Sequence, residues 1–148
     1  GSVIPYFKSL LENGSDFLPI THSDMTRFLL TLDQAVDLID WAYRFPQSHG
    51  KIAVPKVKSM RVVDLANSLI KYYGKEGKVE LKEIGIRSGE KLHEEMISTE
   101  EWLRTQKWQN YLITNEKHTD KLWSYSSESS LLDDDEIHDF LQSSGVIK

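Results

Sequence analysis

Residues 85–96 read Gly-Ile-Arg-Ser-Gly-Glu-Lys-Leu-His-Glu-Glu-Met, and the rest of the chain is organised around this stretch. Two glycines, Gly85 and Gly89, bracket Arg87. Because glycine adopts positive φ at little cost and lets other groups approach its backbone, we predict a tight loop that presents the arginine. The planar guanidinium matches the oxygens of a phosphate or a carboxylate. The stretch therefore predicts an arginine available for anion binding.

Glu90 follows Arg87 by three residues and places an anionic group at the same rim. A carboxylate accepts hydrogen bonds from a diol, so the pair suits a ligand with both phosphate and sugar hydroxyls. A weak, solvated ion pair at a helix start is the alternative that this stretch alone leaves open. Leu92 and Met96 are spaced i to i+4, which predicts the buried face of such a helix.

Composition is that of an ordinary globular domain, with 148 residues, 39% hydrophobic and 28% charged. The length fits one domain over 1–148. A net charge of −5 argues against a nucleic-acid partner, and the absence of cysteine excludes disulfides and thiolate metal sites. We find no apolar run of membrane-span length and no signal-peptide pattern, so we expect no membrane partner and a cytoplasmic location.

Local patterns predict a mixed α/β fold in which several helices pack on short strands. Helices are expected from Pro5 to Asn13, from Thr31 to Pro46, from Ser59 to Gly74, as a turn at 98–102, and from Asp133 to Gln142. Strands are expected at Phe17–Ile20, Ile52–Val54, Val79–Ile84 and Trp108–Ile113. Residues 115–130 are polar and serine-rich, and we expect a mobile segment with Trp123 and Tyr125 as anchors.

Two helix starts carry specific expectations. Thr31 and Gln34 have the form of a capping box, and Ser59 is expected to cap the next helix. After Thr31, apolar residues recur at helical spacing and should form core. These residues are Leu32, Ala35, Val36, Ile39 and Tyr43.

Residues 85–98 resemble the C-terminal signature of UDP-N-acetylglucosamine 4,6-dehydratases, which are lyases of the extended short-chain dehydrogenase/reductase superfamily. Two more segments match in the family's order: 25–28 followed by 31–37, and the start of the chain at 1–7. A weaker match runs from 123–127 to the acidic terminal helix. Together the matches cover nearly the whole chain.

The resemblance implies a small C-terminal substrate-binding domain whose Rossmann core is missing. By resemblance, Arg27 and Arg87 contact the diphosphate of a UDP-sugar and Glu90 contacts the ribose. In the resembling enzymes the strand that corresponds to Phe17–Ile20 borders the uracil, mostly through backbone groups, which implies Ile20 and the following Thr21 as binding residues. Two positions depart from the family pattern, since His22-Ser23 replaces Asp-Pro and Ser88 replaces a proline.

Catalytic residues of the superfamily are absent from this sequence. None of the six tyrosines is followed by lysine at i+4, and no glycine-rich dinucleotide motif follows a strand. The five histidines show no metal-ligand spacing. We therefore expect no cofactor, no metal and no catalytic group here, with NADP bound by the N-terminal Rossmann domain of the complete enzyme.

The function expected from the resemblance is binding of the UDP moiety within an NADP-linked 4,6-dehydratase, with or without inversion at C5, of surface polysaccharide, capsule or flagellin-glycan biosynthesis. The expected partners are UDP-N-acetylglucosamine or a related UDP-sugar, the Rossmann domain, and further copies in a homo-oligomer. Two alternatives stay open: a non-catalytic assembly module, and the substrate domain of a related UDP-sugar epimerase.

Overall fold

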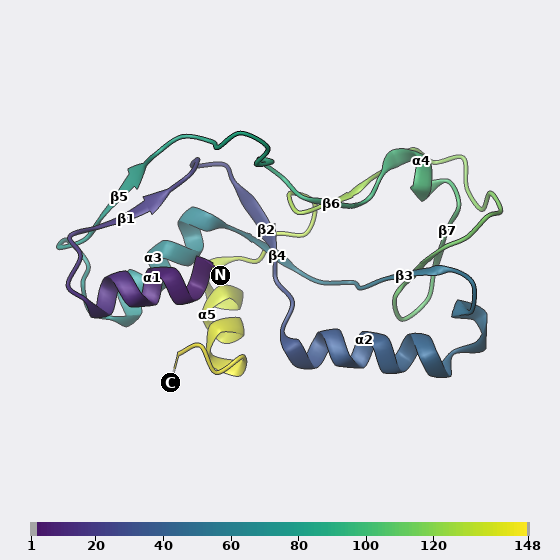
Figure 1. Cartoon of the computed structure of the whole chain (residues 1–148), viewed down its shortest axis with the longest axis horizontal. Coiled ribbons are helices and arrows are strands. Elements are labelled where there is room, and N and C mark those ends of the chain that lie inside the picture. Colours follow the sequence, from purple (N-terminus) through teal and green to yellow (C-terminus); the bar gives the residue numbers. More distant parts are fainter. Residues whose placement is uncertain (1–2, 148) are drawn as a thin grey trace.

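Residues 3–147, which the computed structural model describes, form two lobes joined by short central strands (Figure 1). The first lobe contains α1 (Val3–Glu12), β1 (Phe17–Ile20), α3 (Val62–Tyr72), β5 (Glu80–Glu83) and α5 (Asp134–Ser143). The second contains α2 (Leu32–Arg44), the 3-10 turn η1 (Pro46–Ser48), β3 (Ile52–Val54), α4 (Thr99–Trp102), β7 (Thr105–Lys107) and β8 (Tyr111–Ile113). Four strands lie between them: β2 (Thr26–Phe28), β4 (Ser59–Arg61), β6 (Glu95–Ile97) and β9 (Tyr125–Ser126).

Strand pairing is mostly between segments that are distant in sequence. β1 pairs in parallel with β5, with Phe17 opposite Glu80. β2 pairs antiparallel with β4, and β6 with β9. The third sheet has the order β3-β8-β7 and is antiparallel throughout. The predicted mixed α/β class, with helices on short strands, is confirmed.

The first lobe holds the larger hydrophobic core, built from one face of each of its three helices. Fully buried pairs at i, i+4 supply much of it, as the helical period requires. They are Phe7 and Leu11 on α1, Leu65 and Leu69 on α3, and Ile137 and Leu141 on α5. Each such side chain contributes about 1.5–3 kcal/mol on burial. This core fixes α1 and β1, which carry one wall of the candidate site.

Tyr125 lies at the centre of the smaller core, among Val54, Ile97, Trp102 and Ile113. Its hydroxyl donates to the Val57 carbonyl at 2.5 Å and accepts from the Val57 N–H at 2.8 Å. Burial raises the pKa of the phenol, while the hydrogen bond to Val57 acts in the opposite direction. Tyr125 and Trp123 therefore anchor the polar segment 115–130, as predicted, and the mobility of that segment stays a prediction.

We expect Tyr125→Phe to lower the free energy of unfolding by about 1–3 kcal/mol, because both Val57 backbone groups then stay buried without this partner. Urea denaturation should show a lower midpoint with an unchanged slope. Tyr43→Phe is the matched control, since the Tyr43 side chain is 80% exposed. Equal midpoints for Tyr125→Phe and the wild type would show that the Val57 groups find water instead.

The α2 helix confirms one prediction and corrects another. Thr31 and Gln34 form the predicted capping box, with Gln34 N donating to Thr31 Oγ1 at 3.1 Å and Thr31 N donating to Gln34 Oε1 at 2.9 Å. The predicted core face is wrong, because α2 contains no buried residue. Ala35 is half-buried, and the other four residues are exposed: Leu32, Val36, Ile39 and Tyr43.

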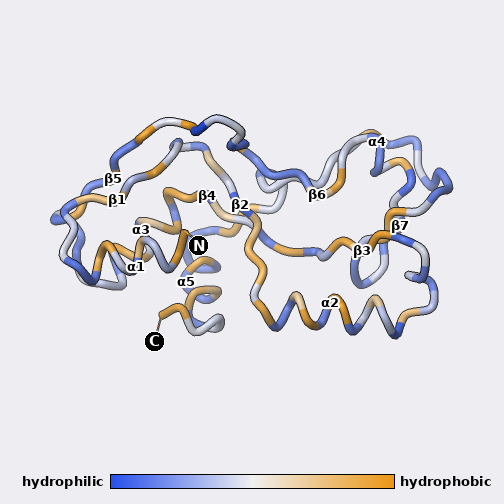
Figure 2. Tube along the Cα trace, viewed as in Figure 1, coloured by the Kyte–Doolittle hydropathy of each residue, from blue (hydrophilic) through white to orange (hydrophobic). Residues whose placement is uncertain are grey.

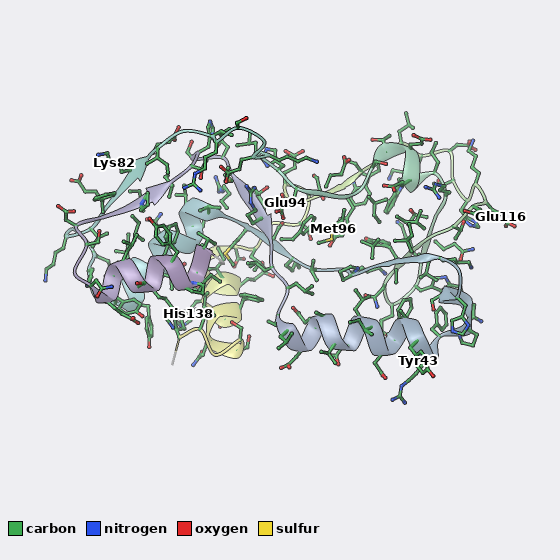
Figure 3. All side chains as sticks on the ribbon, viewed as in Figure 1. Tyr43, Lys82, Glu94, Met96, Glu116 and His138 are labelled. Carbon is green, nitrogen blue, oxygen red and sulfur yellow. The ribbon has the colours of Figure 1, made fainter. Side chains whose placement is uncertain are left out.

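Figure 2 shows hydrophobic segments recurring along α2, and Tyr43 is marked near its end in Figure 3. The α2 helix has the predicted apolar face. Within residues 3–147 no element covers that face, and Leu32 is 81% exposed. An amphipathic pattern shows which face of a helix is apolar. It does not show whether the surface that packs on this face belongs to the same part of the chain. We call Leu32, Val36, Ile39 and Tyr43 the α2 face.

The helix predicted through Leu92 and Met96 is also wrong. Residues 85–94 are loop, and Glu95–Ile97 form β6, paired with β9. The Leu92 carbonyl accepts from Thr26 N at 3.1 Å, so the backbone hydrogen bonds of this segment go to β2 and β9. Long-range pairing has overridden a local helical spacing.

Two smaller corrections concern Ser59 and the region 108–113. Ser59 lies in β4, its hydroxyl is buried without a hydrogen-bond partner among residues 3–147, and Arg61 occupies the N-cap of α3 without a side-chain cap bond. The strand expected at 108–113 is shorter, because Trp108 N donates to Asn110 O at 2.8 Å in the turn between β7 and β8. β7 itself was not predicted.

Other helix boundaries agree with their sequence signals. Ser98 and Glu101 form a capping box at α4, and the hydrogen bonds from Ser98 lower the pKa of Glu101. Asp133 and Glu136 form a capping box at α5. In the described part of the chain, no helix combines the length and the apolarity needed to cross a lipid bilayer.

Candidate functional site

A pocket of about 780 Å³ lies between elements of the first lobe and β2, and both predicted arginines line it. Arg27 comes from β2, whereas Arg87 and Glu90 come from the loop after β5. Thr21, just beyond β1, also lines it. The remaining wall is mainly apolar and comes from α1 and its neighbours: Val3, Pro5, Tyr6, Phe7, Pro19, Met25, Val62 and Ile84.

The loop that carries Arg87 has the predicted geometry. Gly85 and Gly89 adopt φ of 85° and 82°, a region that residues with a Cβ rarely enter. Between them the chain turns back, with Glu90 N donating to Arg87 O at 3.0 Å and Arg87 N donating to Glu90 Oε2 at 3.4 Å. The Arg87 side chain is exposed at the pocket rim. The two glycines therefore decide the direction in which Arg87 and Glu90 face.

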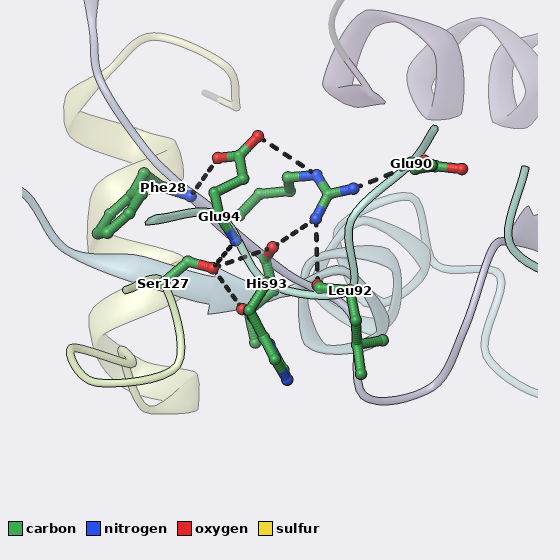
Figure 4. Close-up of polar contacts among 8 residues, drawn as sticks. Phe28, Glu90, Leu92, His93, Glu94 and Ser127 are labelled. Atoms are coloured by element: carbon green, nitrogen blue, oxygen red, sulfur yellow. Dashed lines mark hydrogen bonds and ion pairs between the residues drawn. The ribbon is translucent and has the colours of Figure 1, made fainter. Parts of the chain in front are cut away.

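Arg27 is held more firmly than Arg87. Its Nη1 donates to the carbonyls of Thr26 at 2.7 Å and Leu92 at 3.2 Å (Figure 4). Its Nη2 lies 3.5 Å from Glu90 Oε1, and its Nε lies 3.6 Å from Glu94 Oε1. Four oxygens therefore hold this guanidinium in place. The Arg27 side chain is 22% exposed and still lines the pocket.

A buried polar network fixes the backbone beneath Arg27. Thr26 Oγ1 lies 2.5 Å from Ser127 Oγ and 2.8 Å from His93 Nδ1. Ser127 Oγ also accepts from Glu94 N at 2.9 Å. Thr26 and Ser127 are buried and stand 101 residues apart in sequence. Because buried polar groups must be paired, this network locks β2 against the segment 92–94.

Of the predicted site residues, the structure brings four into one pocket: Thr21, Arg27, Arg87 and Glu90. Ile20 is the exception. Its side chain is buried in the first core, and its carbonyl accepts from Ile84 N at 2.8 Å. Any contact of Ile20 with a ligand would therefore have to come from the remaining lone pair of a backbone carbonyl that is already engaged.

Sequence reasoning missed Glu94 and the α1 wall. Glu94 is within the motif but was not singled out, because its ion pair with Arg27 joins β2 to a distant loop. Its position at the junction of the lobes is visible in Figure 3. Val3 and Tyr6 entered only as part of the family match at residues 1–7, since no local signal shows which exposed side of a helix borders a cavity.

Chemically, the pocket offers two guanidinium groups, an apolar wall and one carboxylate, which pairs with the Arg27 guanidinium and accepts from the Arg87 backbone N–H. Such a set suits an anion attached to a hydroxylated, partly apolar body. No group of three or more metal-ligating side chains occurs within residues 3–147. The lining of this pocket thus combines charged groups with apolar side chains.

Comparison with known proteins gives a family match over residues 1–116, to the family described as "Polysaccharide biosynthesis protein". Over 112 residues the chain is 42% identical to UDP-N-acetylglucosamine 4,6-dehydratase (inverting) of Campylobacter jejuni, covering 75% of this chain and 31% of that protein. The capsular polysaccharide biosynthesis protein CapD of Staphylococcus aureus is 38% identical over 68% of this chain and 17% of its own length.

A UDP-glucose 4-epimerase of Rickettsia felis is 41% identical over 68% of this chain and 28% of its own length. The chain thus spans about a third or less of the curated relatives it matches. A solved structure, the X-ray structure of Pen from Bacillus thuringiensis, matches 99% of this chain and 47% of that chain with a TM-score of 0.84 at 24% identity. At this identity the likeness concerns the fold.

Proposed function

Because this chain belongs to the polysaccharide biosynthesis protein family, we propose that it binds the UDP moiety of a UDP-sugar as the substrate-binding part of a 4,6-dehydratase. The observation that carries the proposal is the convergence of Arg27, Arg87 and Glu90 on one pocket. The resemblance to an inverting UDP-N-acetylglucosamine 4,6-dehydratase supports that sugar nucleotide as the first ligand to test.

In this proposal the pyrophosphate lies between the two arginines. Arg87, at the exposed rim, closes over it, while Arg27 contacts it from the pocket side. Glu90 then accepts hydrogen bonds from the ribose hydroxyls, and the apolar α1 wall packs against the rest of the nucleotide. A hydrogen bond to a charged group is worth about 1.5–3 kcal/mol, so three such residues suffice for a binding site.

Binding requires an exchange of partners at Arg27. In the structure, the Glu90 and Glu94 carboxylates pair with this guanidinium at 3.5 and 3.6 Å. A pyrophosphate brings more negative charge than one carboxylate, so it displaces Glu90 from Arg27 and frees that carboxylate for the ribose. The ion pair between Arg27 and Glu90 thus keeps both groups at the pocket.

NADP does not fit the residues of this chain. The sequence contains no glycine-rich strand-to-helix turn and no Tyr-x-x-x-Lys pair. We therefore assign cofactor binding and hydride transfer to the N-terminal Rossmann portion of a longer protein, and positioning of the substrate to this chain. The relatives' greater length supports this division of roles.

The α2 face is the surface on which that Rossmann portion packs. Four large apolar side chains on one helix face are exposed, and Leu32 and Tyr43 are each at least 80% exposed. The matching relatives have about two thirds of their length outside the matched region. A surface of this kind marks an interface. The exposed face also favours the second candidate function, a non-catalytic assembly module that associates with itself.

Isothermal titration calorimetry tests the proposal on the wild type, Arg87→Ala and Glu90→Ala, with UDP and UDP-N-acetylglucosamine. We expect each variant to lower the affinity about ten-fold or more, because each removes one charge-assisted contact. Lys82→Ala is the matched control, since Lys82 lies on β5 and does not line the pocket.

Equal heats from the wild type and both variants would overturn the assigned roles. Concentration-dependent sedimentation together with an absence of UDP binding would favour the assembly module. The epimerase alternative, which the Rickettsia relatives keep open, is separated by product analysis of the full-length enzyme with UDP-N-acetylglucosamine.

A further inference from the structure

A second pocket, of about 630 Å³, lies in the other lobe beside the β7–β8 hairpin. Three of the four tryptophans of the chain line it: Trp102, Trp108 and Trp123. Tyr111 adds a fourth aromatic ring. It shares no lining residue with the pocket of Arg27 and Arg87, so it is a separate site.

The aromatic rings are held in fixed orientations. Trp102 packs edge-on against Tyr111 with centroids 5.5 Å apart, and against Trp123 at 4.2 Å. Trp108 is in the hairpin turn, packs edge-on against Phe45 at 5.1 Å, and is 43% exposed. An exposed indole on a rigid turn offers a preformed flat surface at low entropic cost.

The charge around these rings is opposite to that of the chain as a whole. The net charge is −5, yet no aspartate or glutamate lines the pocket, whereas Lys107 and Lys121 do. Lys107 Nζ lies 5.0 Å from the centre of the Trp102 ring. Two acidic residues adjoin lining residues in sequence: Asp120 pairs with Lys117, and Glu101 belongs to the capping box with Ser98. The pocket therefore combines ring faces with ammonium groups.

We propose that this second pocket binds an acidic saccharide, a pyranose unit that carries a carboxylate. The C–H groups of a pyranose are weakly positive and pack on the negative face of an indole. Its hydroxyls suit Gln106 and Thr119, which also line the pocket. The carboxylate is attracted by Lys107 and Lys121, and the volume fits one or two sugar units.

Intrinsic tryptophan fluorescence tests this site directly, since three tryptophans line it and none lines the pocket of Arg27 and Arg87. The probes are a hyaluronan tetrasaccharide, which alternates glucuronic acid with N-acetylglucosamine, and neutral chitotetraose. We expect the acidic probe to change the emission saturably and to bind at least ten-fold more tightly than the neutral one.

Trp108→Ala and Lys121→Gln should each weaken binding of the acidic probe at least five-fold, measured by calorimetry so that loss of a fluorophore does not matter. Circular dichroism and thermal unfolding check that both variants remain folded. Arg27→Ala should leave this binding unchanged, which separates a failure here from a failure of the UDP proposal.

Three results would overturn the inference. The first is the absence of saturable binding by either tetrasaccharide. The second is equal affinity for the acidic and neutral probes, which would remove the role of the lysines. The third is a change of tryptophan emission by UDP that Trp108→Ala abolishes, which would make the pocket a nucleotide site.

Discussion

Leu69→Ala is expected to lower the free energy of unfolding by about 2–5 kcal/mol, because truncating a fully buried leucine loses transfer free energy and leaves a cavity. Leu69 lies on α3 at 0% exposure, between the helices that form the first core. Urea denaturation followed by circular dichroism measures the change as a shift of the midpoint.

Leu32→Ala is the matched control, with the same chemical change at an 81% exposed site on the α2 face. In this chain it should change the free energy of unfolding by no more than about 0.5 kcal/mol. If the two variants lost similar stability, the α2 face would be buried in solution, which would point to self-association.

Arg27→Ala is expected to reduce the affinity for UDP-N-acetylglucosamine about ten- to hundred-fold, measured by calorimetry, because the proposed contact with the pyrophosphate is charge-assisted. Arg27→Lys should restore only part of the affinity, since an ammonium cannot donate to two oxygens as a planar fork does. This variant separates loss of charge from loss of geometry.

Glu94→Gln is a control variant for which we expect the affinity to change in the opposite direction. The amide keeps an oxygen for the Phe28 N–H, which now donates to Glu94 Oε2 at 3.4 Å, but it no longer competes as a charge for Arg27. We expect a modest gain in affinity. Unchanged binding in Arg27→Ala, or weaker binding in Glu94→Gln, would contradict the exchange of partners proposed at Arg27.

The elements that sequence predicted well carry their own local signals. α2 begins at a capping box and ends before Pro46, and α5 begins at Asp133 with Glu136 reaching back. The loop of Arg87 was predictable because Gly85 and Gly89 alone supply its positive φ angles. Such features depend on a few neighbouring residues, and tertiary contacts did not change them.

The missed strands have two or three residues, too few to show an alternation. β2, β6 and β9 exist because of pairing and hydrogen bonds between distant segments, such as Thr26 with Ser127. The same reason explains the wrong helix at Leu92 and Met96. Two apolar residues four positions apart are compatible with a helix or a strand. Pairing with a partner strand decides between the two.

By itself, the sequence determined the capping box at the start of α2, the glycine-bounded loop and the family resemblance, and it named the charged residues that we propose as ligand contacts. Only the tertiary structure decided that Arg27, Arg87 and Glu90 share one pocket, that Glu94 pairs with Arg27, and that the α2 face is left uncovered within residues 3–147. The physical reason is the distance along the chain over which each kind of interaction acts. Backbone preference and capping act over a few residues, whereas burial and ion pairing depend on which distant segments the fold brings together.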